Sequence, residues 1–515
     1  MSAVGFWHWA AREPDRLALV DPSERQVSFG ALHSACNRVA NGVRAMGLKQ
    51  GDGIAVILPN CVEFYEVFLA ALQTGLYFTP INHFLTAREG AYVLADSEAK
   101  VLVSHSRHAQ TTLGVLAESG FEANRCLVVG EIDGLRPYAG FKAQHSPAPP
   151  ADRNAGASMV YTSGTTGKPK GVRSPLPAGP PEGPTAIRAA MGEMIGWKPG
   201  DGVYLLNGPL HHSAPIAFST LALHLGHTVV MTDKWDAERV LALIDTYRVT
   251  NTQMVPIHFH RLVKLPETVK KRHDVSSVCS ILHSAAPCPV PVKREVIEWF
   301  GPVVYEYYGG TEGGVTHCNS EEWLSKPGTV GRPWPGVEIE ILDDDMKPLP
   351  ANEIGAVYFR TPNGPPEYFK DPAKSESARH GDFFTLGEMG YVDRDGWLFL
   401  VDRKSDMLVS GGVNIYPAEI EAVLLQHPKI QDAAVFGVPN EEWGEEVKAV
   451  LEPIATAEAG ESLAGDVLDF CRDRLARYKL PRSIEFIDEL PRGPNGKLYK
   501  RQLREPYWQG HEKRI

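Results

Sequence analysis

A short segment rich in hydroxyls, glycines and lysines, residues 161–171, has the residue types that bind phosphate groups. Glycines let backbone N–H groups approach a phosphate, hydroxyl groups donate further hydrogen bonds, and a lysine neutralises negative charge. One alternative is a P-loop, which needs a longer run between its glycines and a hydroxyl residue directly after its lysine. Here only two residues separate Gly164 from Gly167, and Pro169 follows Lys168. This spacing excludes a P-loop and leaves a plain surface loop as the other alternative.

Further segments with suitable chemistry follow downstream. Residues 308–312 combine a tyrosine, whose ring can stack on a base, with a glutamate, whose oxygens suit a hard cation. The glycine pair Gly411 and Gly412 suits a narrow passage in which the backbone lies against a thin ligand. Lys497 follows a glycine in a turn near the C-terminus. Taken singly, each of these segments is equally consistent with a solvated turn.

The elements that must position these residues alternate along the chain. Apolar residues recur at helical spacing from Leu32 to Met46, and a continuous apolar run at 54–58 predicts a buried strand. A second helix is expected at 62–72 and another strand at 100–103. The order strand, helix, strand predicts right-handed parallel units and hence a layered α/β fold.

A domain boundary is expected near residues 400–406. Beyond it, Pro417 is placed to open a helix, strands are expected at 433–436, 447–451 and 484–487, and a helix is expected at 467–475. We therefore predict a large N-terminal α/β body, residues 1–402, and a small mobile C-terminal α+β domain, residues 403–515.

Composition excludes several other classes of protein. A net charge of -11 argues against nucleic acid as the main partner. Seven cysteines without CxxC spacing favour a reduced, cytoplasmic chain. No secretory signal or transmembrane segment is expected, whereas peripheral membrane contact is left open.

Several motifs in the same order resemble one family. Residues 162–171 resemble the signature of the acyl-adenylate-forming superfamily, which includes acyl-CoA synthetases, peptide-synthetase adenylation domains and firefly luciferase. The resemblance extends from about residue 27 to residue 501. It implies an acyl-CoA synthetase that uses ATP, Mg²⁺ and coenzyme A.

The resemblance also implies a role for each motif. The departing phosphates would be held by the first motif, which contains Thr162, Ser163, Gly164, Thr165, Thr166, Gly167 and Lys170. The adenine would contact Ser284, Ala285, Tyr308 and Gly309, and the α-phosphate would contact Thr311. The metal would be bound by Glu312 and Thr166, and Lys497 would bridge the substrate carboxylate and the α-phosphate.

Two of the motifs depart from the family pattern. The ribose would be held by Glu388 and Arg403, although the family usually has aspartate at the first position. The hinge between body and lid would be residues 402–406, with Ser405 where the family commonly has Asp or Lys. After lid rotation, Gly411 and Gly412 would line the pantetheine tunnel, with a plain turn as the alternative.

The acyl pocket is expected near His212, which would gate the site or contact the carboxylate. No acidic residue follows it in the run 213–216, which argues against amino acid substrates. The predicted activity is formation of acyl-CoA, AMP and pyrophosphate from a hydrophobic acid, whether fatty, aromatic or steroid. Three alternatives stay open: a ligase that loads a carrier protein, a luciferase-like oxidase, and an inactive nucleotide-binding regulator. A homodimer is also left open.

Overall fold

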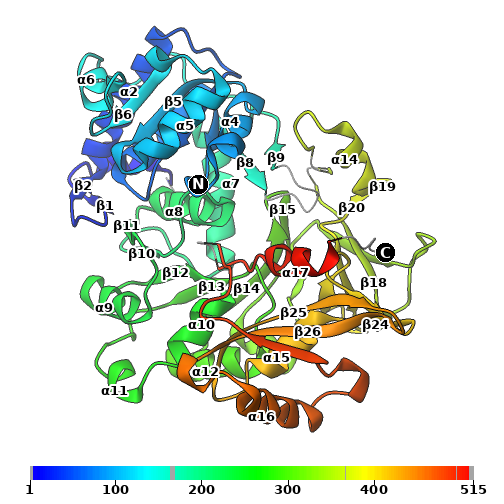
Figure 1. Ribbon diagram of the computed structural model, residues 1–515. Helices are drawn as coiled ribbons and strands as arrows, with labels where there is room; N and C mark the ends of the chain where they lie inside the picture. The colour runs from blue at the N-terminus through cyan, green and yellow to red at the C-terminus, as the bar shows by residue number, and fades with distance from the viewer. Residues whose placement is uncertain (1–3, 163–168, 363, 366, 494–495, 510–515) are drawn as a thin grey trace. The chain divides into compact units, whose positions relative to one another are not determined.

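The computed structural model describes residues 4–162, 169–362, 364–365, 367–493 and 496–509 (Figure 1). The chain forms two compact units. Unit 1 comprises Met1–Gln253, Pro266–Leu282 and Pro366–Ser377, and unit 2 comprises Met254–Leu265, His283–Pro365 and Ala378–Ile515. In the described parts, no helix is both long and apolar enough to cross a membrane.

The first sheet of unit 1 carries the strands on both sides of the glycine-rich segment. Its order is β7-β6-β5-β3-β4-β8-β9, parallel except for the antiparallel pair β8–β9. The helices α4 and α5 pack against each other beside this sheet (Figure 1). The strands are β3 (Gly53–Ile57), β4 (Tyr77–Pro80), β5 (Ala99–His105), β6 (Cys126–Val129), β7 (Arg136–Pro137), β8 (Ala157–Thr162) and β9 (Lys170–Arg173). The helices are α2 (Phe29–Ala45), α3 (Val62–Thr74), α4 (Ala87–Asp96), α5 (Ala109–Ser119) and α6 (Tyr138–Ala143).

These bounds confirm the helices and strands predicted for the first 130 residues. The predicted strand at 54–58 is β3, whose five residues are all buried, as its unbroken apolar run requires. The predicted helix at 62–72 is α3, which is buried on every side and ends at the left-handed Gly75.

A second sheet of unit 1 has the strand order β13-β12-β10-β11-β1-β2. The pairs β10–β11, β10–β12 and β1–β11 are parallel, and β1–β2 is antiparallel. The strands are β1 (Leu17–Val20), β2 (Gln26–Ser28), β10 (Val203–Leu206), β11 (Thr228–Met231), β12 (Asn251–Met254) and β13 (Ser280–His283). Unit 1 also contains α1 (Phe6–Arg12), α7 (Glu182–Met194), α8 (Ser213–Leu225), α9 (Ala237–Tyr247), α11 (Glu267–Lys270) and α14 (Pro372–Ser377).

Unit 2 begins with antiparallel strands. Strand β14 (Val304–Gly310) pairs with β15 (Gly313–Cys318), which pairs with β16 (Arg332–Pro333). A further antiparallel sheet contains β17 (Glu338–Leu342), β18 (Gly355–Arg360), β19 (Arg379–His380), β20 (Phe383–Phe384), β21 (Glu388–Val392) and β22 (Leu398–Arg403). The helices of this part are α10 (Pro256–Val263), α12 (Val290–Phe300) and α13 (Ser320–Ser325).

The C-terminal part of unit 2 has helices on both faces of one sheet. Along β25 (Ile430–Asn440), Ala433 and Val435 pack with α15 (Pro417–Leu424) and α16 (Glu461–Arg472), whereas Ala434 and Phe436 pack with Leu503 of α17 (Lys500–Trp508) (Figure 1). This alternation is the period-two pattern of a strand buried on both faces. The remaining strands are β23 (Leu408–Ser410), β24 (Val413–Ile415), β26 (Gly444–Pro453) and β27 (Ser483–Phe486).

The predicted α+β composition of this part is confirmed, and Pro417 opens α15 as expected. Helix α16 begins at Glu461, six residues before the predicted Val467, and the spacing of Leu463, Val467 and Cys471 on its buried face was the signal that the prediction missed. The predicted boundary between residues 402 and 403 stays a prediction.

Gly156, directly before β8, lies against the backbone of the segment 71–76. Gly156 donates its N–H to the carbonyl of Leu72 at 2.9 Å. An added Cβ would lie 2.6 Å from the carbonyl oxygen of Leu76 and closer still to that of Ala71. Both obstacles are backbone atoms, which cannot move aside by a rotamer change.

We expect Gly156→Ala to lower the free energy of unfolding by about 1–3 kcal/mol, the usual cost of overpacking. Urea denaturation of the variant and the parent measures it. Gly140→Ala is the matched control, because Gly140 lies in α6 with open space around its Cα. A loss of stability at Gly140 equal to that at Gly156 would contradict this account.

Candidate active site

The glycine-rich segment joins two paired strands of unit 1. Strand β8 ends at Thr162 and β9 begins at Lys170, and these two residues are opposite each other in the antiparallel pair. Tyr161 anchors this end of β8, because its hydroxyl donates to Asp96 at 2.6 Å. The predicted phosphate-binding residues Ser163, Gly164, Thr165, Thr166 and Gly167 lie outside the described residues.

The cation next to this segment is already paired. The Nζ of Lys170 lies 2.8 Å from Oδ2 of Asp371, and hydrogen bonding to Lys170 lowers the pKa of Asp371. Both residues belong to unit 1. A phosphate bound by Lys170 would therefore have to share or replace this carboxylate, and its phosphate role stays a prediction.

In unit 2, two predicted site residues, Tyr308 and Arg403, contact the carboxylate of a third, Glu388. Tyr308 is buried in β14, and its hydroxyl donates to Oε2 of Glu388 at 2.8 Å. Glu388 opens β21 and lies opposite Arg403, the last residue of β22, with 3.5 Å between Oε1 and the Arg403 Nε. The spacing of fifteen residues between Glu388 and Arg403 is therefore the length of a β-hairpin whose two ends are paired. Burial, together with the Glu388 charge, raises the pKa of Tyr308 well above its usual range.

The neighbouring hairpin turn presents Thr311 and Glu312. Gly310 of β14 pairs with Gly313 of β15, so the two residues between them form the tip of a tight turn. Both side chains are partly exposed. Gly309, a predicted adenine contact, lies in the last part of β14 and pairs with Gly314.

Lys497 shares the electrostatic environment of these groups. Burial and the Arg403 guanidinium lower the pKa of Lys497 to about 8, while the carboxylates of Asp406, Glu388 and Glu312 act in the opposite direction. The structure thus brings together, within unit 2, a lysine and the acidic and basic residues predicted to bind ATP. This shared electrostatic environment, together with the contacts of Tyr308, Glu388 and Arg403, is the main support for a site here.

The turn that carries Lys497 is held by a buried pair that the sequence did not reveal. Arg492 donates to Oδ1 of Asp432 at 2.7 Å and to the carbonyl of Gly496 at 2.6 Å. The Asp432 side chain is almost fully buried. Because Asp432 lies sixty residues from Arg492 and belongs to no motif, sequence reasoning had no signal for this pair.

The predicted adenine-contacting residues Ser284 and Ala285 follow β13. Ala285 has a φ of 80°, a left-handed conformation that a residue with a Cβ seldom adopts. Burial raises the pKa of Tyr307 to about 12, and a hydrogen bond with the Ser284 hydroxyl opposes this. Non-glycine residues with a left-handed backbone conformation, like Ala285, cluster at binding sites, where the surrounding structure holds them in place.

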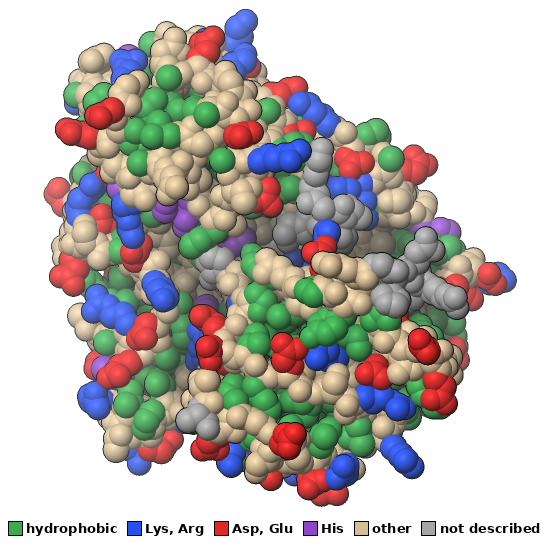
Figure 2. Space-filling view, viewed as in Figure 1, with side chains coloured by type: hydrophobic (Ala, Val, Ile, Leu, Met, Phe, Trp, Pro, Cys, Tyr) green, Lys and Arg blue, Asp and Glu red, His purple; other side chains and the backbone are tan. Residues whose placement is uncertain are grey.

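His212 lies in unit 1, directly before α8, and Figure 2 shows several histidine side chains (purple) on one face of the molecule. The rings of His211 and His212 have centroids 4.4 Å apart, and His83 stacks on His108 at 4.1 Å. Burial lowers the pKa of His211 well below its usual value, so its ring is neutral. Within the described residues, neither ring nitrogen of His211 has a hydrogen-bond partner. The sequence predicted a role for His212 but not this cluster, since His83 and His108 are distant in the chain.

Gly411 and Gly412 form the two-residue turn between β23 and β24. Both have positive φ, 58° and 79°, as a type I′ hairpin turn requires. An added Cβ at Gly411 would lie 2.6 Å from the ring of Trp443. A hairpin turn accounts for both glycines without a ligand, so the pantetheine role stays a prediction.

The predicted hinge segment 402–406 contains a helix cap. One carboxylate oxygen of Asp402 accepts from the N–H of Ala418 at 2.9 Å, in the first turn of α15. Burial raises the pKa of Asp402. The structure does not test whether Ser405 is a pivot.

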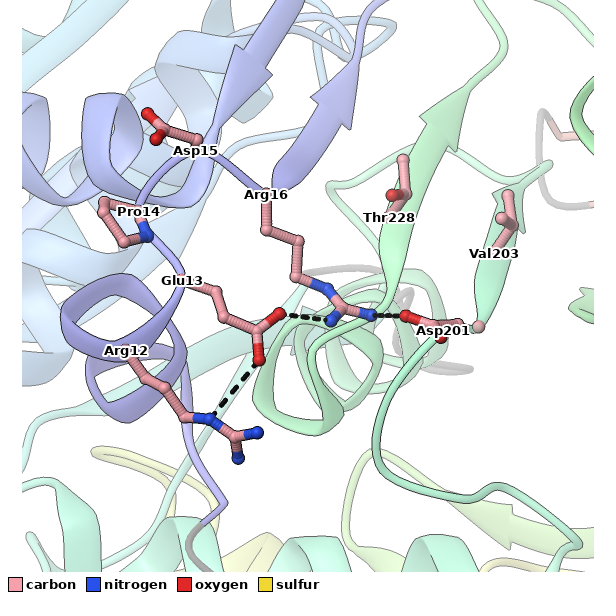
Figure 3. A pocket seen from close by; sticks show the side chains of 9 residues that line it. Arg12, Glu13, Pro14, Asp15, Arg16, Asp201, Val203 and Thr228 are labelled. Atoms are coloured by element: carbon pink, nitrogen blue, oxygen red, sulfur yellow. Dashed lines mark hydrogen bonds and ion pairs between the residues drawn. The ribbon is translucent and has the colours of Figure 1, made fainter.

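One cavity of unit 1 includes none of the predicted site residues. It has a volume of about 580 Å³ and lies between the segment 12–16 and the region of Asp201 and Thr228 (Figure 3). Arg16 bonds to Glu13 at 2.8 Å and to Asp201 at 2.7 Å across it. Arg16 is thus paired with two of the acidic side chains that line the cavity.

Family models identify two matching regions. A model described as AMP-binding enzyme matches residues 6–369, and one described as AMP-binding enzyme C-terminal domain matches residues 419–497. Together they extend over most of the chain. The first alone covers more than half of it.

Curated relatives match over nearly their whole length. The chain is 30% identical over 503 residues to the fatty acid–[acyl-carrier-protein] ligase ScoC of Streptomyces coeruleorubidus, covering 94% of this chain and 92% of that protein. It is 30% identical over 501 residues to the long-chain-fatty-acid–CoA ligase FadD13 of Mycobacterium tuberculosis, covering 97% of each. It is 32% identical over 517 residues to the feruloyl-CoA synthase of an Amycolatopsis species, covering 98% and 99%.

A solved structure agrees with these relatives. The o-succinylbenzoate CoA synthetase MenE of Bacillus subtilis, in complex with its acyl-adenylate intermediate, superposes with a TM-score of 0.79 at 28% identity, covering 97% of each chain. The predicted α/β body with a smaller C-terminal part and the predicted acyl-adenylate-forming class are both confirmed. The chain belongs to the AMP-binding enzyme family, whose members among these relatives are named as ligases or synthases that join an acid to coenzyme A or to an acyl carrier protein.

Proposed function

We propose that the chain is an ATP-dependent carboxylic acid:coenzyme A ligase that acts through an acyl-adenylate on a hydrophobic acid. The observation that carries this proposal is the convergence in unit 2 of Tyr308, Glu388, Arg403 and Lys497. An aromatic ring, a carboxylate for ribose hydroxyls and two cations are the groups that a nucleotide requires. The family membership supplies the reaction to which they belong.

In the first step, a carboxylate oxygen of the acid attacks the α-phosphorus of ATP, and the bond to the bridging oxygen breaks. The products are acyl-AMP and pyrophosphate. Two anions must be brought together, so positioning and charge stabilisation carry the catalysis. Lys497 stabilises the charge that develops on the α-phosphate, and Glu388 with Arg403 orients the ribose. The residues 162–170 hold the departing pyrophosphate.

In the second step, the thiolate of coenzyme A attacks the acyl carbonyl, and AMP leaves. We propose that residues 403–515 rotate between the two steps about the segment 402–406. Rotation would withdraw Lys497 and bring Gly411 and Gly412 to the pantetheine. The bond from Asp402 to the N–H of Ala418 would then be specific to one of the two lid positions.

Magnesium fits the residues present. Among the described residues, no group of three His, Cys, Asp or Glu side chains is arranged to hold a metal. Mg²⁺ bound with a nucleotide needs only one or two carboxylates, because phosphates and water complete its shell. Glu312, partly exposed at its turn, would supply that carboxylate, with Thr166 as the second protein ligand. When bound, the ion neutralises phosphate charge.

The acyl acceptor and the compartment belong to this proposal as well. Coenzyme A is favoured as the acyl acceptor because the names of FadD13 and the feruloyl-CoA synthase include it. An acyl carrier protein is the second candidate acceptor, because ScoC is named as a ligase that acts on one. We propose a cytoplasmic location, since the seven cysteines are all free. A homodimer stays open to measurement of the mass in solution.

A pyrophosphate-release screen tests the proposed function directly. The enzyme is incubated with Mg·ATP and a panel of fatty, aromatic and steroid side-chain acids, and then with coenzyme A or a phosphopantetheinylated carrier protein. Acid-dependent pyrophosphate release followed by acyl-CoA formation is expected. Thioester formation on the carrier alone would favour the second candidate, and no acid-dependent release would overturn both.

Lys497→Ala should slow acyl-AMP formation by about a hundredfold or more, the usual loss when a group that stabilises transition-state charge is removed. Single-turnover release of pyrophosphate measures this step. Thioester formation from preformed acyl-AMP should keep its parent rate, because Lys497 has left the site by then. Equal losses in both half-reactions would contradict the rotating lid.

The lowered pKa of Lys497 predicts a pH dependence of the first step. The ammonium form, which stabilises negative charge, predominates below about pH 8, and the neutral amine predominates above it. The value of kcat/KM for ATP should therefore be level below this pH and fall as pH rises through about 8, since kcat/KM reports the free enzyme. Lys497→Arg is the control, because its side chain stays charged. A parent profile that shows no fall below pH 10 would contradict the assignment.

A further inference from the structure

Unit 2 contains a buried cluster of three ionisable side chains outside the predicted site. The Nζ of Lys293, on α12, lies 2.5 Å from Oε2 of Glu306, on β14. The Nε2 of His283, at the end of β13, lies 3.4 Å from the same oxygen. Lys293 and His283 are fully buried, and Glu306 is 6% exposed.

Burying the charged pair of Lys293 and Glu306 has a large desolvation cost. Removing two charges from water costs several kcal/mol for each ion, and apolar side chains of similar volume often stabilise a protein at least as well. The surroundings are adapted to the charges: Lys293 lies over the ring of Trp323 at 4.5 Å, and the Phe259 ring packs on His283 at 5.1 Å. Lys293 keeps the pKa of Glu306 low despite burial, so the carboxylate is charged.

The position of the cluster relates it to the predicted adenine contacts. Glu306 lies two residues before Tyr308, and both side chains are buried on the same face of β14. His283 directly precedes Ser284 and Ala285. Tyr307, on the opposite face of the strand, hydrogen-bonds to Ser284. The segment 283–285 is thus attached to β14 on both faces.

The left-handed backbone conformation of Ala285 explains why the segment 283–285 must be held against β14. A residue with a Cβ is strained in that conformation, which persists only where the surrounding structure holds it in place. The 3.4 Å contact of His283 with Glu306 and the hydrogen bond of Ser284 with Tyr307 join this segment to β14 directly before Ala285 and can supply that restraint.

We propose that Lys293, Glu306 and His283 are positioning residues that hold the left-handed turn at Ala285 against β14 and so set the shape of the ATP-binding surface. The proposal rests on the proposed function for the adenine contacts of Ser284, Ala285 and Tyr308. The three residues do not touch ATP. They act through the two backbone segments to which they belong.

Direct binding of Mg·ATP, measured by calorimetry without any acid, tests this proposal. Glu306→Gln and Lys293→Met should each raise the Kd for Mg·ATP about tenfold or more, because the turn is no longer held in place. Glu306→Gln removes the negative charge but retains the side-chain volume and an acceptor for Lys293. Its Kd for Mg·ATP therefore tests the proposal even if Lys293→Met does not fold. Urea midpoints measured in parallel separate lost stability from lost binding.

Lys142→Met is the matched control. Lys142 of α6 pairs with the buried Glu66 of α3 at 2.7 Å, and this pair contains no predicted nucleotide contact. Its loss should lower the urea midpoint and leave the Kd unchanged. If Glu306→Gln lowers the midpoint but binds Mg·ATP within twofold of the parent, the cluster is structural only and the inference is overturned. If the parent itself binds no Mg·ATP, the proposed function fails instead.

Discussion

The candidate site depends on one carboxylate, that of Glu388. It accepts a hydrogen bond from the buried Tyr308 and lies opposite Arg403 in the β21–β22 hairpin. Lys497 is subject to the same charges, although it is more than a hundred residues further along the chain. Glutamate is one methylene longer than the aspartate usual in the family, and its Oε2 accepts a hydrogen bond from the Tyr308 hydroxyl. The departure from the family pattern is therefore compatible with an ordered site.

The charged side chains of unit 2 differ in how deeply they are buried. The pair of Lys293 and Glu306 is the most deeply buried, and Arg492 with Asp432 holds the Lys497 turn. Lys497 itself is only half-buried, so its proton can exchange with water as ligands change. Fixed buried pairs and one less buried lysine in the same unit suit an enzyme that must bind two anions and then release one of them.

The sequence was sufficient for what is local or periodic. Apolar runs and helical spacing predicted β3, α3 and α15, and the family resemblance predicted that Glu388 and Arg403 would lie together. It was not sufficient for contacts between distant residues without a motif. His83 with His108, Asp371 with Lys170, and Lys293 with Glu306 leave no periodic trace, because each pair is formed by tertiary packing. The residues 163–168, although the strongest motif, lie outside the described structure.

The central claim is that the groups around Glu388 bind ATP so that an acid can be adenylated. Its most direct measurement is mass-spectrometric detection of acyl-AMP after the enzyme is mixed with ATP, magnesium and an accepted acid in the absence of coenzyme A. The account predicts acyl-AMP in an amount close to that of the enzyme, and its disappearance when coenzyme A is added. Release of AMP or ADP without any acyl-AMP, under conditions in which the acid is bound, would contradict it.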